Sequence, residues 1–299
     1  MTAATMNPEP SAKVKKPIDW RRAVLHTFLI SMCVVWLFPL LYTIYQSLRP
    51  YSETSDKGFV SLPDTLTLDN YISAWNNAEL ARYFLNTLVI VAPAVIMVLL
   101  LASMMAFAVS RYSWRFNLVL LMLFTALNLL PPQVIITPLF KLIFVPIPGP
   151  FENGKLLYDN YLGMILIHVA FQLGFCTFVL SNYMKTLPKE LNEAAVVDGA
   201  SVWTTFTRII FPLTRPALAA LATLQVTWIY NDFFWALMLM RTGSKYPITS
   251  ALNNLQGQFF VDNNLIAAGA ILVALPTLIV FFVLQKHFIA GLTLGSTKG

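Results

Sequence analysis

The sequence predicts an all-α membrane protein with six transmembrane helices, and three observations support this fold class. Of the 299 residues, 57% are hydrophobic and only 11% are charged, whereas a soluble domain usually carries about 25% charged residues. The apolar residues form six runs, each about as long as the ~20 residues that a helix needs to cross a bilayer. The basic residues between the runs are distributed unequally between two sides. In such a protein the modest net charge of +6 reports orientation rather than a nucleic-acid partner.

The amino-terminal residues 1–22 are polar, basic and contain proline, and we expect them to form a disordered cytoplasmic tail. No small-x-small cleavage site follows them. The first apolar run is therefore expected to remain as a membrane span rather than to be removed as a signal peptide.

The six runs together predict a membrane domain over residues 23–285, followed by a cytoplasmic tail over 286–299. Asp232, in the fifth run, is the only Asp, Glu, Lys or Arg in the six runs. The sequence Pro131-Pro132-Gln133 is expected to break the third helix. In chain order, the runs are about Ala23–Leu48, Tyr83–Ser110, Phe116–Phe140, Asn160–Met184, Pro216–Met240 and Asn263–Gln285.

The basic residues predict the orientation of these spans. Thirteen Lys and Arg residues lie on the side of the amino terminus, and seven lie on the other side. Because basic residues are enriched in cytoplasmic loops, we expect both termini and the connection 185–215 in the cytoplasm.

This connection, which contains ELNEAAVVDGASVWTTFTRIIFPL, predicts a helical hairpin. Pro188 suits a first helical turn, and Gly199 can adopt the left-handed conformation that ends a helix. Ser201 is a candidate N-cap for a second helix over Val202–Phe211, which Pro212 is expected to stop.

The hairpin resembles the "EAA" loop of ABC-importer permeases, in which Glu-Ala-Ala and three further residues precede a glycine. Here these residues are Glu193-Ala194-Ala195 and Gly199, followed by Ile209, Ile210 and Pro212. Its position between the fourth and fifth of six spans also matches. More narrowly, Ala23–Gly299 resembles the maltose-type permeases of the carbohydrate-uptake branch, with the matching stretches SLPDTLTLDNY, YFLNTLVI, WIYNDFFWAL and FIAGLTLGSTKG.

The resemblance implies a type I ABC-importer permease in a prokaryotic cell membrane that imports a di- or oligosaccharide or a related polyol. The implied partners are lipid, a second non-identical permease, an ATPase dimer that binds ATP and Mg²⁺, and an extracytoplasmic sugar-binding protein. Glu193 would anchor the hairpin to the ATPase, Ala194 and Ala195 would permit close approach, and Asp198 and Gly199 would form the corner before Pro212. The fifth loop would reach the sugar-binding protein through Gln256, Gly257 and Gln258.

No cofactor or enzymatic activity is expected of this chain itself. Gly149–Leu156 reads GPFENGKL, which is one residue short of a phosphate-binding loop. Leu156 cannot ligate Mg²⁺, and Pro150 lacks an amide that the loop needs. ATP hydrolysis therefore requires a partner subunit.

Polar residues within the spans are candidates for a substrate path. Asp232 is costly at the bilayer centre and should face protein or water. Aromatic rings beside a carboxylate and an amide suit a polyol, but helix packing and backbone hydrogen bonding explain the same residues equally well. The candidates are Asn231, Asp232, Trp228, Trp235, Gln172 and Asn128.

Two other functions are weighed against an ABC importer. An ion-coupled secondary transporter of a small polar solute would carry more ionisable groups at mid-membrane and a pseudo-repeat, whereas the sequence has one carboxylate and no evident repeat. A membrane-embedded enzyme ranks last because no acid–base pair or metal cluster is present. The first loop, Arg49–Arg82, is net acidic and is either another docking surface or simply a solvated loop.

Overall fold

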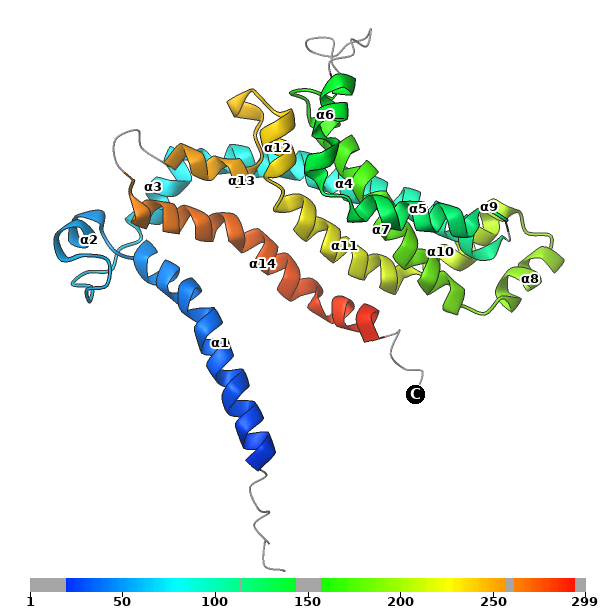
Figure 1. Cartoon of the computed structure of the whole chain (residues 1–299), viewed down its shortest axis with the longest axis horizontal. Coiled ribbons are helices and arrows are strands. Elements are labelled where there is room, and N and C mark those ends of the chain that lie inside the picture. The colour runs from blue at the N-terminus through cyan, green and yellow to red at the C-terminus, as the bar shows by residue number, and fades with distance from the viewer. Residues whose placement is uncertain (1–19, 113, 144–156, 256–260, 294–299) are drawn as a thin grey trace, which may run out of the picture. The chain divides into compact units, whose positions relative to one another are not determined.

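The computed structural model of the chain describes residues 20–112, 114–143, 157–255 and 261–293, and the regular structure of these residues is entirely helical (Figure 1). The chain divides into two compact units, Met1–Tyr45 and Gln46–Gly299. The all-α prediction is confirmed for the described residues.

The first unit contains α1 (Trp20–Ser47), which ends two residues into the second unit. The helix is apolar on all sides, and its most hydrophobic window has no buried residues. A helix of this kind needs lipid or another protein around it.

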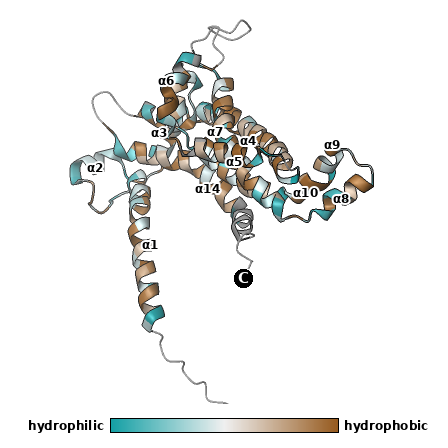
Figure 2. Ribbon diagram, turned by 45° about the vertical axis from the view of Figure 1, so that its right-hand side comes forward, coloured by the Kyte–Doolittle hydropathy of each residue, from teal (hydrophilic) through white to brown (hydrophobic). Residues whose placement is uncertain are grey.

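The second unit is built around three long helices, α4 (Leu80–Arg111), α7 (Tyr161–Thr186) and α14 (Asn263–Thr293). α4 packs against α7, and it presents a buried stripe of mostly small residues at a spacing of four: Ala94, Val98, Ala102 and Ala106. Small side chains let two membrane helices approach closely. Hydrophobic residues run along α4, α14 and α5 (Asn117–Leu129), whereas α2 (Tyr51–Lys57) is mostly hydrophilic (Figure 2).

Two of the six predicted runs are interrupted. The third splits into α5 (Asn117–Leu129) and α6 (Pro132–Ile143), which confirms the expected break at the two prolines. The fifth splits into α11 (Arg215–Tyr230) and α12 (Phe234–Leu239), although this run contains no internal proline or glycine that predicts a break.

Among the described residues, four helices are long and apolar enough to cross a membrane. A fifth span results if Val202–Leu213 and Arg215–Tyr230, which are bent by 72° relative to each other, together form one span. The six predicted runs therefore do not form six continuous helices. In addition, α14 continues to Thr293, beyond the predicted span end at Gln285, and no proline ends the helix earlier.

Short helices occupy both ends of the second unit. α2 (Tyr51–Lys57) and α3 (Asp69–Asn77) lie between α1 and α4 in sequence. The connection from α12 to α14 contains η3 (Gly243–Lys245), α13 (Ile248–Ala251) and η4 (Leu252–Leu255). α3 and α13 lie at one end of the unit, and the hairpin that contains α8 (Glu190–Val197) and α9 (Val202–Thr204) lies at the other (Figure 1).

Candidate functional site

The predicted hairpin begins with α8 (Glu190–Val197), which ends in a hydrogen-bonded turn at Gly199. The Ala200 N–H donates to the Ala195 carbonyl at 2.9 Å, and the Gly199 N–H donates to the Val196 carbonyl at 3.0 Å. These are the two bonds of a Schellman motif. Gly199 has φ +74°, a left-handed conformation that residues with a Cβ disfavour. The predicted helix end at Gly199 is confirmed, while Pro188 lies just before α8 rather than in its first turn.

The second limb is a continuous helical stretch of α9 (Val202–Thr204), the π-helix η2 (Thr205–Ile210) and α10 (Phe211–Leu213). Ser201 accepts the Thr204 N–H at 3.2 Å, so the predicted N-cap is confirmed. The helix was expected to stop at Pro212, and it ends at Leu213, one residue past the proline. Pro212 therefore lies in the last turn of this continuous stretch, shortly after the π-helix η2.

One face of α8 is exposed and carries both charge and apolar surface. Glu190, Glu193, Ala194 and Val197 are all exposed, and their spacing places them on one side of the helix. Val197 is 86% exposed. Asp198 is exposed at the corner, and Val202 and Trp203 are exposed on the second limb. The hairpin therefore presents an acidic and apolar surface that the described residues do not cover.

Ala195 differs from the other predicted coupling residues because it is buried within this chain. Its small side chain faces inward, and α8 packs against η2. Phe206 of η2 lies 5.3 Å from Phe107 of α4 and 5.7 Å from Trp203, measured between ring centroids. These contacts fix the hairpin to α4, so Ala195 serves internal packing rather than close approach of another protein.

Arg111, at the end of α4, joins the base of the hairpin to α7. Its Nη2 donates to the Met184 carbonyl at 2.9 Å, and its Nη1 donates to the carbonyls of Leu187 and Pro188 at 3.3 and 3.4 Å. Basic side chains commonly satisfy the last carbonyls of a helix in this way. A cavity of about 270 Å³ lies beside Arg111 and is also lined by Lys189, Asn192 and Glu193 of the hairpin.

Asp232 lies at the break between α11 and α12. Its carboxylate accepts the backbone N–H groups of Trp235 and Ala236, each at 3.3 Å. Thr249 of α13 donates its hydroxyl to the Asp232 carbonyl at 2.7 Å. The neighbouring Asn231 is exposed, and its amide donates to the Thr227 carbonyl at 2.8 Å. This geometry favours the reading that Asp232 bonds backbone and starts α12.

His168 of α7 is a neighbour of Asp232 that sequence reasoning missed. Its Nε2 atom lies 3.8 Å from the Asp232 carboxylate, and the side chain is only 4% exposed. The two residues are far apart in sequence, and a lone histidine within an apolar run gives no signal of its partner.

The remaining path candidates have different environments. Trp235 is buried, with its ring centroid 4.9 Å from that of Phe171, whereas Trp228 is 44% exposed. Gln172 accepts from the amide of Gln225 at 3.5 Å, and Gln225 is fully buried and was not predicted. Asn128 lies in α5, but its side chain is outside the described residues.

Asp159 fixes the connection after α12 to the start of α7. Its carboxylate accepts the N–H groups of Arg241 and Thr242 at 2.9 and 2.8 Å and the Thr242 hydroxyl at 2.6 Å. Lys245 lies 3.7 Å away. Burial alone raises the pKa of Asp159, but the hydrogen bonds from Thr242 and Arg241 and the charge of Lys245 together hold that pKa below its usual range.

Asn86 and Thr87 of α4 hold the same connection from a second side. The Asn86 amide donates to the carbonyls of Ser244 and Tyr246 at 2.9 Å each, and Thr87 accepts the Ile248 N–H at 2.8 Å. The segment from Arg241 to Ile248 is therefore bonded to α4 and to Asp159, which directly precedes the N-cap of α7. Sequence reasoning did not find these partners.

The predicted receptor-contact residues Gln256, Gly257 and Gln258 lie outside the described residues, as does the phosphate-loop-like segment Gly149–Leu156. Within the described part of the chain, no group of three or more His, Cys, Asp or Glu residues could hold a metal ion.

Comparison with known proteins shows which family this chain matches. Residues 98–293 match the family described as "Binding-protein-dependent transport system inner membrane component". A probable ABC transporter permease of Pyrococcus horikoshii is 34% identical, over 88% of this chain and 92% of that protein. The arabinooligosaccharide transport permease of Halalkalibacterium halodurans is 31% identical, over 96% of this chain and 99% of that protein. The fold is similar to that of a bacterial ABC transporter involved in the import of alginate, with TM-score 0.74, 19% identity, and coverage of 93% of this chain and 100% of that chain.

Proposed function

Because this chain belongs to the family of inner membrane components of binding-protein-dependent transport systems, we propose that it is the permease subunit of an ABC importer that takes up a carbohydrate. It is a membrane transport subunit and not an enzyme. The match includes the hairpin and four of the six predicted spans. That match is the observation that carries the proposal.

A carbohydrate of the oligosaccharide class is the proposed substrate. One relative that aligns over nearly its whole length is named for arabinooligosaccharide transport, and the transporter of similar fold is described as importing alginate. The sequence resemblance to maltose-type permeases supports the same class.

The hairpin is the proposed docking site for the ATPase, with Glu193 as the anchoring carboxylate and Ala194 and Val197 beside it. Moving a two-state equilibrium from 1:99 to 99:1 needs about 5.5 kcal/mol of differential binding, so the connecting element must be stiff. The Schellman turn at Gly199 and the contact of Phe206 with Phe107 provide that stiffness. Asp198 borders the same surface, and Pro212 belongs to the limb that leads into α11.

The complete assembly follows from this role. An ATPase dimer binds ATP and Mg²⁺, a second non-identical permease completes the pathway, and an extracytoplasmic sugar-binding protein delivers the substrate near Gln256–Gln258. Six spans cross the membrane of a prokaryotic cell with both termini in the cytoplasm, and the broken third and fifth runs each count as one of the six.

Within the pathway, Trp228 and Asn231 are the candidates best placed to meet the sugar because they are exposed at and before the break after α11. Gln172 and Asn128 are further candidates on α7 and α5. Asp232 and the buried Trp235 contribute indirectly, by holding the start of α12.

Glu193→Ala tests the proposal in the intact importer, with sugar uptake and co-purification of the ATPase as readouts. We expect both to fall, because the substitution removes the anchoring charge without changing helix propensity unfavourably. Glu190→Ala is a matched control that removes an equal charge from the same face of α8. Equal losses from both variants would contradict the specific role of Glu193. If no ATPase co-purifies with the unmodified chain, and uptake persists without ATP, the chain is a secondary transporter instead.

A further inference from the structure

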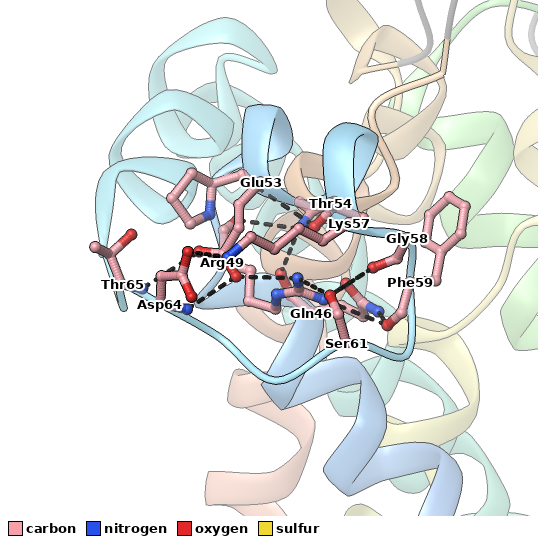
Figure 3. Close-up of polar contacts among 12 residues, drawn as sticks. Gln46, Arg49, Glu53, Thr54, Lys57, Gly58, Phe59, Ser61, Asp64 and Thr65 are labelled. Atoms are coloured by element: carbon pink, nitrogen blue, oxygen red, sulfur yellow. Dashed lines mark hydrogen bonds and ion pairs between the residues drawn. The ribbon is translucent and has the colours of Figure 1, made fainter.

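The loop between α2 and α3 turns its backbone polar groups inward, toward a buried arginine. Arg49 is 0% exposed, and its Nη1 donates to the carbonyls of Gly58 and Phe59 at 3.4 Å each (Figure 3). The side-chain amide of Gln46 donates to the same Phe59 carbonyl at 2.6 Å. The first half of the loop is therefore bonded from within the protein.

Glu53 bonds the second half of the loop in the same way. Its carboxylate accepts the backbone N–H groups of Asp64 and Thr65 at 3.0 and 3.2 Å (Figure 3). It also accepts from Nη2 of Arg49 at 3.0 Å. Backbone groups at both ends of the loop thus find partners on buried or half-buried side chains of this chain.

Apolar side chains form the outside of the loop. Val60 is 89% exposed and Leu62 is 85% exposed, and Phe59 is exposed beside them. In water, a loop can leave its backbone groups to the solvent, whereas close to hydrocarbon these groups need partners within the protein. Polar groups inside and apolar side chains outside therefore suit apolar surroundings better than water.

α3 adds a second apolar surface directly after this loop. Leu68 at its N-cap, Ile72 and Trp75 are exposed, and their spacing of four and three residues places them on one side of the helix. The opposite side is buried through Asn70 and Ala74, and α3 packs there against α14. We call Leu68, Ile72 and Trp75 the α3 stripe.

Both ends of this segment adjoin helices that are long and apolar enough to cross a membrane. α1 ends at Ser47, and α4 begins at Leu80. α3 ends at Asn77, three residues before α4 begins. Three residues of chain reach at most about 10 Å, so α3 lies close to the point where α4 enters the membrane.

Hydrogen bonds fix the segment to the start of α14. Asn264, in the first turn of α14, is fully buried, and its amide donates to the carbonyls of Gln46 and Arg49 at 3.0 Å each. Asn70 of α3 donates to the carbonyls of Ser47 and Arg49 at 2.9 and 2.7 Å. The loop, α3 and the start of α14 therefore form one bonded unit.

We propose that the loop tip, Val60 and Leu62, and the α3 stripe form an interfacial anchor that lies among the lipid headgroups. Because α4 runs from α3 to the base of the hairpin, the anchor lies at the membrane surface opposite the hairpin. Its bonds to Asn264 hold the start of α14 at a fixed depth while the hairpin moves. This inference goes beyond the proposed function and requires only that the chain spans a membrane.

Two features favour lipid as the occupant. Tryptophan is enriched at membrane–water interfaces, where its ring is apolar and its N–H stays hydrated, and Trp75 is on the exposed stripe. Free amphipathic helices use Lys and Arg to reach anionic lipids, but α3 is held at the membrane by the adjoining spans and does not need them.

The charges of the segment agree with this occupant. Arg49 pairs with Glu53, and Lys57 pairs with Asp64, so four of the six charged residues in 46–77 are paired with one another. Paired charges cost less than single charges when a surface is taken out of water. The segment can therefore enter the headgroup region without exposing most of its charge.

Site-specific labels in the intact importer test the anchor. Val60→Cys and Ile72→Cys are each made in a Cys33→Ser background, which leaves only the buried Cys176 as a native thiol, and the partner subunits are cysteine-free. Each variant is labelled in detergent with a polarity-sensitive fluorophore and reconstituted into nanodiscs of phosphatidylethanolamine and phosphatidylglycerol. Asn77→Cys, at an exposed position of α3 outside the stripe, is the matched control.

Quenching of the fluorophores reports what covers each position. We expect spin-labelled lipid to quench the labels at residues 60 and 72 strongly and iodide in the buffer to quench them weakly, with the reverse order at residue 77. The substituted side chains are exposed in this chain, so the variants should fold, and co-purification of the partner subunits checks that they assemble.

The other possible occupants give different results, and each of these results overturns the proposal. Iodide quenching at residue 60 or 72 that is as strong as at residue 77 indicates a solvated surface. Protection from both quenchers indicates that the second permease covers the site. Lipid quenching that is lost when the purified binding protein is added indicates that this protein takes the site instead.

Discussion

Replacing Gly199 by alanine should weaken ATPase docking through backbone strain alone. Gly199 has φ +74°, and a Cβ built on it meets no atom within 4 Å. The substitution therefore causes no steric clash, and its cost is that of a left-handed alanine, about 1–2 kcal/mol. Relief of that strain opens the two bonds of the Schellman turn and moves the corner of the hairpin.

Two other glycines separate this effect from general destabilisation. Gly58 has φ +83°, and a methyl group added to it would also meet no atom within 4 Å, while Gly243 is equally open but has no left-handed φ. Gly58→Ala should cost more stability than Gly199→Ala, because φ +83° with ψ 168° is a backbone region essentially restricted to glycine, whereas Gly243→Ala should cost little.

The readouts are the melting temperature and the dissociation constant of the purified ATPase for the permease complex. We expect both Gly199→Ala and Gly58→Ala to lower the melting temperature, with the larger decrease in Gly58→Ala. Only Gly199→Ala should weaken ATPase binding, by about 5- to 30-fold if the full strain energy opposes docking. ATPase affinity that is unchanged in Gly199→Ala, or reduced equally in Gly58→Ala, would refute the reasoning.

Three further predictions concern groups away from the hairpin. Asp159→Asn should lower the melting temperature at pH 7. The pKa of Asp159 is held below its usual value near 3.9, so its contribution to stability is complete above that value and is lost as pH falls through the folded-state pKa. The melting temperatures of the variant and the unmodified protein should therefore converge in acid, and a difference that stays constant with pH would contradict this. Asn264→Leu should cost about 1–3 kcal/mol, because the carbonyls of Gln46 and Arg49 lose a buried donor; an unchanged denaturation midpoint would contradict it. Trp235→Ala should cost about 3–5 kcal/mol, whereas Trp228→Ala should change stability little and sugar uptake more; equal melting temperatures for the two variants would show that burial does not separate their roles.

The continuous spans could be predicted from the sequence because they depend on composition over about 20 residues. The second, fourth and sixth runs became α4, α7 and α14, and each helix starts within three residues of its predicted start. Asn160 caps α7 by accepting the Leu162 N–H, at the position where the run was expected to begin. The hydropathy of a run does not depend on tertiary contacts, so it predicts a span without knowledge of the rest of the fold.

The break in the fifth run could not be predicted in the same way. Two polar residues, Asn231 and Asp232, are too few to mark a break in a long apolar run. The helix ends there because Asp232 accepts the N–H groups of the next helix and lies beside His168. An aspartate before an apolar stretch is a weak N-cap signal. Its partner on another span gives no local signal at all.

The hairpin shows both outcomes within a few residues. Gly199 and Ser201 act through local backbone geometry, and their predicted roles as helix end and N-cap are confirmed. Ala195 depends on what packs around it, and its surroundings were mispredicted. The hydrogen bonds around the buried Arg49 could not be predicted from the sequence either, because their donors and acceptors are spread from Gln46 to Asn264.

The bend at Thr214 makes Val202–Leu213 of the hairpin and α11 the two arms of a rigid lever. Thr214 is fully buried, its N–H bonds back to Ile210 and Phe211, and its carbonyl accepts from Leu218, so the pivot is stiff. At about 1.5 Å per residue, Val202–Leu213 is about 18 Å long and Arg215–Tyr230 about 24 Å long. A tilt of the shorter arm that preserves the 72° angle moves the far end of the longer arm by about 1.3 times as much, and in a different direction. A force on the hairpin is thereby converted into a larger displacement at the far end of α11.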